Sequence, residues 1–572
     1  MRLTISVVFC FILSACNQSV TTVNDEADAQ NRFDYASAIA SSYRYQTLRN
    51  PAPYIPPQCY TRTQNDNGQV HNPCYTCHTP STRPNYIQDG DLQLSYSFAE
   101  DMRVNQWRNV FRDRSAEMRQ ISDEAIKEYI RNSNYFDEQN RIVLQQVLQS
   151  PPHSWDANNN GRWDGFIPDA AFNFDARGFD HDAQGRPTGW RSYGYYPFPG
   201  TFWPTNGSTN DVLIRLPEAF RQTVDGQYDA QVYAINLAIV EAMIREQDID
   251  IEAVDEARLG NIDLDRDGRI ARASKVVYDW APLQDRHMWY VGRAHMLQQQ
   301  GEIKTAAGLF PVGTEFLHTL RYIDVADNGD IQLAARFKEV RYARKRQWLN
   351  YAWLRNRADS EVKEKRDFPD RLRQIRGDHE RGVSNGQGWT YAGFIEDAGG
   401  RLRPQSHEEL GFCLGCHGGT GVTRDGVISF PRKTGFDTPQ HGWYHWSQHS
   451  MRGLAEPKRV DGQGEYTLYL QRNGAGDEYR ANREVMDKFF TSEGVLKQPM
   501  IAAMQQDISQ LLWPGPDRAM QLNRAYRLIV QEQSFIHGRD ALVSPPKQVH
   551  RTLEADQSTG IKIVTPALPL AP

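Results

Sequence analysis

Two short segments each place a pair of cysteines and a histidine within five positions. They are CYTCH, with Cys74, Cys77 and His78, and CLGCH, with Cys413, Cys416 and His417. Three kinds of chemistry use such thiol pairs: a zinc site, a redox-active disulfide, and a haem attached through both sulfurs. The surrounding sequence has to distinguish among them.

The composition shows that the repeated pattern is not accidental. With 7 cysteines and 15 histidines in 572 residues, roughly 0.002 copies of C-x-x-C-H are expected by chance. A four-cysteine zinc site uses the same thiol pairs but does not need the histidine after each pair. A thioredoxin-like site needs one pair beside a β-α-β pattern, and neither motif has such a pattern around it. These features favour haem attachment.

At these two pentapeptides the sequence resembles the c-type cytochromes. The resemblance covers the motifs and a few flanking residues, not the whole chain. It implies that the two cysteines of each motif form thioether bonds to one haem and that the histidine is an axial ligand of its iron. The implied covalent residues are Cys74, Cys77, Cys413 and Cys416, and the implied axial ligands are His78 and His417. We therefore expect two haem c groups, while Cys59 has no assigned role.

The second axial ligand of each iron comes from a less specific pattern. His441, His445 and His449 recur every four residues after the second motif, a spacing that places them on one face of a helix or one side of a strand. We expect His445 or His449 to ligate the second iron, with His441 as a further candidate. His71, just before the first motif, is a candidate for the other haem. The alternative is an aromatic-rich segment with hydrogen-bonded histidines.

Two loops between the motifs carry alternating oxygen-bearing side chains. DANNNGRWDG and DLDRDGRI resemble the start of an EF-hand calcium loop, in which alternating oxygens surround the ion and a glycine makes the sharp turn. The candidate ligands are Asp156, Asn158, Asn160 and Asp164 in the first loop and Asp263, Asp265 and Asp267 in the second. Neither loop has a glutamate at position 12, so a carboxylate from elsewhere must complete the shell. We expect Ca²⁺ in a structural role, with a solvated turn as the alternative.

The N-terminal residues predict export and lipidation. An apolar run over residues 5–13 is too short to span a bilayer and ends in LSAC. This ending resembles the lipobox of bacterial lipoproteins, which implies removal of residues 1–15 and a lipid on Cys16. Asn17 then implies sorting to the outer membrane, facing the periplasm or the exterior. The alternative is an ordinary signal peptide or an uncleaved anchor.

The composition favours a large exported globular protein. The apolar fraction is only 39%, and 30 prolines with 42 glycines indicate that much of the chain is loop. The net charge of -6 is small for this length, so the chain as a whole gives no support to nucleic-acid binding. A basic stretch over residues 336–381 is interpreted as a solvated face.

The sequence pattern predicts a mixed α+β fold, mainly helix and loop with minor antiparallel sheet, that holds two covalent haem c sites. Helices are expected over residues 122–130, 233–244, 500–512 and 520–531, a hairpin with its turn at Asn328 and Gly329, and a strand over 465–470. The predicted regions are a signal peptide (1–15), a polar tether (16–50), a first haem region (51–150), a middle region with the calcium loops and hairpin (151–400), a second haem region with C-terminal helices (401–545) and an irregular tail (546–572).

Two classes of function fit these features. In the first, the protein carries electrons at the cell envelope, with both irons six-coordinate and redox proteins as partners. In the second, it is a dihaem redox enzyme, peroxidase- or oxygenase-like, with one open coordination position. The wide separation of the motifs argues against the dihaem peroxidase fold, whereas the chain is far larger than two minimal carrier domains require. We take the carrier as the first interpretation and the enzyme as the alternative. A binding protein with structural haem is a third class, and no substrate follows from the sequence.

Overall fold

The computed structural model describes residues 48–201, 203–473 and 482–571. The predicted signal peptide, the lipidation candidate Cys16 and nearly all of the predicted tether lie outside these residues. Within the described ranges, no helix is long and apolar enough to cross a membrane.

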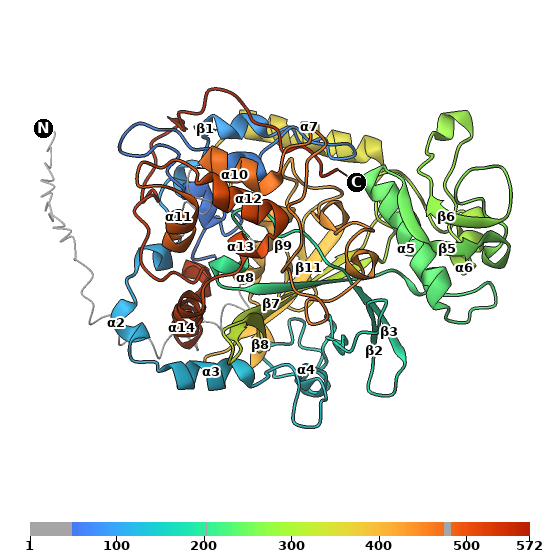
Figure 1. The fold of residues 1–572 in the computed structure, drawn as a ribbon, viewed down its shortest axis with the longest axis horizontal. Helices are drawn as coiled ribbons and strands as arrows, with labels where there is room; N and C mark the ends of the chain where they lie inside the picture. The colour runs from blue at the N-terminus through green and yellow to red at the C-terminus, as the bar shows by residue number, and fades with distance from the viewer. Residues whose placement is uncertain (1–47, 202, 474–481, 572) are drawn as a thin grey trace, which may run out of the picture.

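An antiparallel sheet of nine strands forms the centre of the molecule (Figure 1). Its order is β2-β3-β4-β7-β8-β11-β10-β9, and β12 pairs with β11. The strands are β2 (Phe179–His181), β3 (Pro187–Ser192), β4 (Thr209–Arg215), β7 (Glu315–Val325), β8 (Ile331–Lys345), β9 (Arg376–Asp378), β10 (Gly382–Ser384), β11 (Trp389–Glu396) and β12 (Leu402–Pro404). Two smaller pairs are β1 (Ser95–Tyr96) with β13 (Gln557–Ser558) and β5 (Ile249–Asp255) with β6 (Arg272–Val276).

The prediction of a fold made mainly of helix and loop with minor sheet is wrong, because the nine-stranded sheet organises the chain. Strands β4 and β11 are buried along most of their length, so they lack the alternation of apolar and polar residues that marks a half-buried strand. The predicted strand over residues 465–470 is also wrong. It belongs to helix α10 (Glu465–Asn473), in which Tyr466, Tyr469 and Asn473 are buried at helical spacing.

The predicted hairpin is confirmed as the β7–β8 pair. Its connection contains Asn328 and Gly329, and Gly329 has a φ of 85°, a left-handed conformation that glycine adopts without steric cost. These two strands are the longest in the sheet. On its other side β7 pairs with β4, and β8 pairs with β11.

The described α-helices lie around this sheet. They are α2 (Ser115–Met118), α3 (Asp123–Arg131), α4 (Val143–Val147), α5 (Ala230–Arg245), α6 (Arg293–Gln299), α7 (Tyr351–Asp367), α8 (His407–Gly411), α9 (Cys413–His417), α10, α11 (Arg483–Phe489), α12 (Gln498–Gln506), α13 (Ser509–Leu512) and α14 (Pro516–Glu532). Figure 1 shows α5 and the β5–β6 pair at one end of the molecule and α14 toward the other. The predicted helices are confirmed, except that residues 500–512 divide into α12 and α13.

The sheet separates two hydrophobic cores. Successive residues of a strand point to opposite faces, and the neighbours Phe316 and Leu317 of β7 accordingly belong to different clusters of buried side chains. The face of Leu317 packs on Tyr135 and Trp190. The face of Phe316 belongs to the larger core, which also contains Leu414 from the second motif. The motifs are therefore expected on the face of the sheet that carries Phe316.

Candidate functional site

The first motif lies on a single tight turn. The 3-10 helix η2 (Cys74–Thr76) brings the backbone N–H groups of Cys77 and His78 to the Cys74 carbonyl, at 3.2 and 2.9 Å. Asn72 stabilises the start of the turn, because its Oδ1 accepts from the Tyr75 N–H at 3.3 Å. Both thiols and the imidazole therefore come from one turn of chain.

The second motif forms a short α-helix of its own, α9, directly after α8. Helix α8 begins with a capping box, in which Ser406 accepts from the Glu409 N–H and the Glu409 carboxylate accepts from the Ser406 N–H. Leu414 is buried and anchors α9, whereas both cysteines and the histidine of the motif are only partly buried.

Both motifs open onto one cavity of about 1770 Å³. Its wall includes Cys74, Cys77 and His78 from the first motif and Cys416 from the second, whereas Cys413 and His417 are not among the residues that line it. The chain segments are also bonded directly, because the Val422 N–H donates to the Cys77 carbonyl at 3.2 Å. Residues from the two ends of the chain thus build a single site.

The thiols of this cavity are held in their neutral form. Burial raises the pKa of Cys77 well above its usual range, and the neighbouring thiols of Cys416 and Cys59 raise it further. Burial also raises the pKa of Cys416 to about 11. Cys59 lines the same cavity. A reactive thiol needs a stabilised thiolate, so this environment does not favour a redox-active pair.

A buried carboxylate orients the imidazole of His78. Its Nδ1 lies 2.9 Å from Asp89 Oδ2, and Asp89 is only 8% exposed. The other carboxylate oxygen accepts from the N–H groups of Thr79 at 3.2 Å and Gly421 at 3.0 Å. A hydrogen bond at Nδ1 leaves Nε2 as the atom that can bind a metal. Because Gly421 follows the second motif, Asp89 also connects the two motifs.

A backbone carbonyl orients the imidazole of His417. Its Nδ1 lies 3.0 Å from the Gly426 oxygen, which also accepts from the Tyr391 hydroxyl at 3.1 Å. The Tyr391 ring stacks on the imidazole with a centroid distance of 4.7 Å. An ion pair of 2.5 Å between Lys345 and Asp425 holds the adjoining turn. Burial lowers the pKa of His417 to about 4, so the imidazole is neutral, as a metal ligand must be.

Each motif has the set of donor groups that a haem c group requires. Each motif supplies two thiols and an imidazole with its Nδ1 engaged, and the cavity is larger than the about 300–1,000 Å³ of most ligand pockets. The motif cysteines are not gathered around a common point for zinc. Among the residues that the structure describes, the one cluster with metal-binding spacing is Glu256, Asp263 and Asp265.

The wall of the large cavity is cationic along β8. Burial lowers the pKa of Lys338 to about 7. Arg341 donates to Glu339 at 2.8 Å, and Arg539 reaches the same carboxylate at 2.9 Å. Lys338 and Arg341 belong to the basic stretch that we interpreted as a solvated face, and this interpretation is wrong for these two residues. Arg341 and Arg539 together outnumber Glu339, and this excess of positive charge suits a ligand that carries carboxylates, such as the propionates of haem.

The predicted distal histidines do not lie on the wall of this cavity as far as the chain is described. His445 stacks on Phe174 at 4.7 Å, within the core on the other face of the sheet. Its Nε2 lies 2.6 Å from Asp211 Oδ1, and its Nδ1 lies 2.7 Å from Ser447 Oγ. With both nitrogens engaged there, His445 is not positioned to ligate a metal in the cavity.

The other three candidate histidines also lie elsewhere. His441 stacks on Phe436 at 3.8 Å beside a smaller pocket, and His449 packs edge-on against Tyr444 at 5.3 Å. The backbone explains the correction, because His441 is left-handed with a φ of 55°. The four-residue spacing therefore does not become one face of a helix or strand. His71 is half-buried and is not among the residues that line the cavity.

The first candidate calcium loop gathers its predicted ligands. Asp164 Oδ2 accepts from the amides of Asn158 and Asn160 at 2.9 and 2.8 Å, and Asp156 accepts from the Asn160 N–H at 3.2 Å. Glu380, a buried residue distant in sequence, accepts from the Asp164 N–H at 2.5 Å. The other Glu380 oxygen accepts from the Ala157 N–H at 3.0 Å, so this carboxylate holds the backbone of the loop and does not form a ligand cluster with Asp156 and Asp164.

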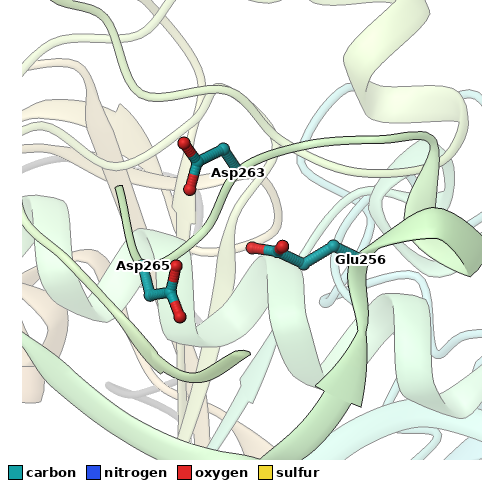
Figure 2. A group of neighbouring side chains, drawn as sticks. All are labelled: Glu256, Asp263 and Asp265. Atoms are coloured by element: carbon teal, nitrogen blue, oxygen red, sulfur yellow. The ribbon is translucent and has the colours of Figure 1, made fainter. Parts of the chain in front are cut away.

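The second candidate loop has a similar outside carboxylate. Figure 2 shows Glu256, Asp263 and Asp265 with their carboxylates turned toward a common space, and their ligand oxygens lie within 4.8 Å of one another. Glu256 is 1% exposed and accepts from the Leu264 N–H at 2.6 Å. Burial and the neighbouring carboxylates raise the pKa of Asp265. Asp267 is exposed and is not part of this cluster.

Three buried carboxylates at these sites escaped sequence analysis: Asp89, Glu256 and Glu380. None of the three belongs to a recognisable motif, because the folding of the chain, and not a sequence spacing, brings each carboxylate to its partners. The incomplete calcium loops were the one available signal, since they required an outside ligand. Nothing in the spacing of His78 and Asp89 indicated their hydrogen bond.

Comparison with known proteins places the chain in a family. Residues 43–509 match a family model whose description reads "-like lipoprotein". The chain belongs to this lipoprotein family. An "Uncharacterized lipoprotein" of Aquifex aeolicus (strain VF5) is 30% identical to this lipoprotein over 579 aligned residues, covering 90% of each chain. No solved structure matches it significantly.

Proposed function

We propose that this lipoprotein is an extracytoplasmic dihaem c-type cytochrome that transfers electrons at the cell envelope. The observation that carries the proposal is the shared cavity, onto which both C-x-x-C-H motifs open. Each motif histidine has its Nδ1 engaged, His78 by Asp89 and His417 by the Gly426 carbonyl. The Nε2 atoms are left for iron, as haem ligation requires.

When bound, haem c supplies reversible one-electron chemistry. The chain's own residues attach and orient the group and set its electrostatic environment. The motif cysteines would provide the covalent links, and Arg341 and Arg539 would offset the charge of the propionates. Asp89 holds the proton at His78 Nδ1 and keeps Nε2 directed to the metal. The redox partners are other proteins of the envelope.

A spectroelectrochemical titration of the purified mature protein tests this proposal. We expect two one-electron steps, each with the absorption changes of a covalently bound haem. A protein that shows no reversible reduction step, or that contains zinc and no Soret band, would contradict it.

We further propose that Cys16 carries the lipid that anchors the chain at the outer membrane. The LSAC ending of the N-terminal apolar run and membership of a lipoprotein family support this assignment. Cells fed a labelled fatty acid should label the wild type and Cys10→Ser, whereas Cys16→Ser should stay unlabelled. Equal labelling of Cys16→Ser would refute the assignment.

We also propose that both acidic loops bind Ca²⁺ as structural clips. The buried Glu256 supports this proposal for the second loop, because its carboxylate joins those of Asp263 and Asp265. At the first loop the support is the arrangement of Asp156, Asn158, Asn160 and Asp164 around one turn. A ligand held only by the native state at about 100 times its Kd adds about 2.7 kcal/mol to the free energy of unfolding. Chelation should therefore lower the Tm of the wild type and have less effect on Glu256→Gln. The exposed Asp285→Asn serves as control, and a Tm indifferent to chelator would contradict the proposal.

A second candidate function is a dihaem redox enzyme with one open coordination position. The observation that favours it is the location of His445, which is engaged outside the cavity. On strand β7, His318 lies two residues before Leu320, which lines the cavity. Burial lowers the pKa of His318 to about 3. Carbon monoxide separates the two functions. Rapid stoichiometric binding to the ferrous protein would support the enzyme, and absence of binding would support the carrier.

A further inference from the structure

A second cavity, of about 210 Å³, lies between α5, β5 and the chain that leads to Trp443. Arg191 lines it and is only 5% exposed. The Arg191 Nε donates to the Arg177 carbonyl at 3.0 Å. Its two terminal amino groups have no hydrogen-bond acceptor within the part of the chain that the structure describes. A buried guanidinium therefore presents unused donors beside a cavity.

Two aromatic rings hold this guanidinium in place. The Arg191 Cζ lies 4.3 Å from the centroid of the Phe179 ring and 3.9 Å from that of Trp443. Stacking covers the faces of the planar group, so its N–H groups can bond only in its own plane. The Arg177 carbonyl occupies one edge, and the remaining donors are already fixed in direction before a ligand arrives.

A second arginine lines the same cavity without an anionic partner. The Arg177 guanidinium lies 5.3 Å from the Phe179 ring, and none of the described acidic residues forms an ion pair with it. Burial and, to a lesser extent, the charge of Arg177 lower the pKa of Arg191 to about 9. Two cations thus share one space, where an anion would relieve their repulsion.

Of the four acidic residues that line the cavity, Glu241, Asp248 and Asp250 pair with other cations, and Glu252 forms no ion pair with any described residue. Glu241 pairs with Arg245 at 3.2 Å and with Lys433 at 3.3 Å. Asp248 at the rim is exposed and lies 3.9 Å from Lys275. The charges of Asp175 and Glu241 reach Arg191, but neither carboxylate hydrogen-bonds to it. Arg191 and Arg177 therefore remain available to bind an anion.

The backbone at this cavity is also unusual. Gln440 and His441 both line it and are consecutive non-glycine residues with positive φ, 50° and 55°. Left-handed conformations of such residues are costly, and they concentrate where the surrounding structure holds a binding surface in place.

We propose that this cavity binds a small oxyanion between Arg191 and Arg177. The fork of N–H donors on a guanidinium matches two oxygens of a carboxylate, sulfate or phosphate group. The cavity is larger than the about 30 Å³ share of one water molecule and smaller than the about 300–1,000 Å³ of most ligand pockets. It therefore suits an anion of a few heavy atoms. The site is independent of the proposed haem function.

Isothermal titration of the full-length mature protein with sulfate, phosphate and acetate tests the proposal, with sodium chloride holding the ionic strength constant. At least one anion should bind with a stoichiometry of one. Binding by the tetrahedral ions alone would identify a sulfate or phosphate site, and binding by acetate alone would identify a carboxylate site.

Three variants locate the site. Arg177→Ala should weaken binding about 10- to 100-fold, the loss expected for a hydrogen bond to a charged group. Arg191→Lys should weaken it similarly, because lysine lacks the planar fork. Arg186→Ala, in an exposed arginine paired with Asp182, should bind like the wild type. Because Arg177 is only partly buried, its variant reports even where Arg191→Lys does not fold. Failure of all three anions to bind, or unchanged binding by Arg177→Ala, would overturn the proposal.

Discussion

The two C-x-x-C-H motifs share a pattern but differ in the partner of their histidines. His78 Nδ1 faces the carboxylate of Asp89 at 2.9 Å, whereas His417 Nδ1 faces the Gly426 carbonyl at 3.0 Å. The carboxylate carries a full negative charge. The carbonyl is a neutral dipole, and it is shared with the Tyr391 hydroxyl. The same five-residue motif therefore meets two different electrostatic environments in one cavity.

If both motifs hold haem as we propose, the two histidine partners would give the two groups different properties. A carboxylate partner makes an imidazole a stronger donor to metal, and outer-shell hydrogen bonds are among the protein's means of setting the potential of a haem. We therefore expect the haem at His78 to have the lower reduction potential. Electrons would then move from the first site to the second within the cavity.

The largest effect is expected when one motif is removed at a time. Cys74→Ser with Cys77→Ser should leave a single haem with the higher potential. Cys413→Ser with Cys416→Ser should leave a single haem with the lower one. Haem content per chain and a redox titration of each variant measure both properties. Two haems in either variant would contradict the assignment. Equal reduction potentials in the two variants would show that the different histidine partners do not set different potentials.

Asp89→Asn is expected to have the next largest effect. The amide keeps the shape of the side chain but removes its charge, so the potential of the first haem should rise toward that of the second. For a one-electron couple, each tenfold change in the balance between oxidised and reduced forms corresponds to about 59 mV. Asp101→Asn, at an exposed residue outside the wall of the cavity, is the matched control. A shift of the second haem alone would be inconsistent with the role assigned to Asp89.

Tyr391→Phe should produce a smaller change in the opposite direction. The variant keeps the ring that stacks on His417 and removes the hydroxyl that donates to Gly426. The carbonyl then accepts from His417 alone, so the potential of the second haem should fall slightly. The lost hydrogen bond should also cost about 0.5–1.5 kcal/mol in the free energy of unfolding, measured by urea denaturation. Tyr193→Phe, at a buried hydroxyl bonded to Ser429, controls for the loss of a buried hydroxyl.

The parts of the fold that follow from local signals could be predicted. Helix α3 begins after Ser122, whose Oγ accepts from the Ala125 N–H, and the β7–β8 turn contains Gly329 in a conformation that favours glycine. Most of the sheet could not be predicted, because strands such as β10 and β12 have only three residues. Their conformation depends on pairing with β11, which no local pattern encodes.

The candidate site shows the same division between features that local sequence signals encode and features that depend on the fold. The motif cysteines and histidines could be located from their spacing. Asp89 could not, because its bond to His78 depends on how the following loop folds back. The spacing of His441 and His445 was misleading, since a left-handed backbone at His441 interrupts any regular element. A repeated spacing locates a site only where the backbone between the residues is regular.

The central claim is that both motifs of this lipoprotein hold covalent haem. The most direct measurement is the haem content of the purified mature wild type after acid-acetone extraction, which removes haem that is not covalently bound. Our account predicts two haems per chain that remain with the protein after extraction. Loss of all haem to the solvent, or a protein that never contained any, would contradict it.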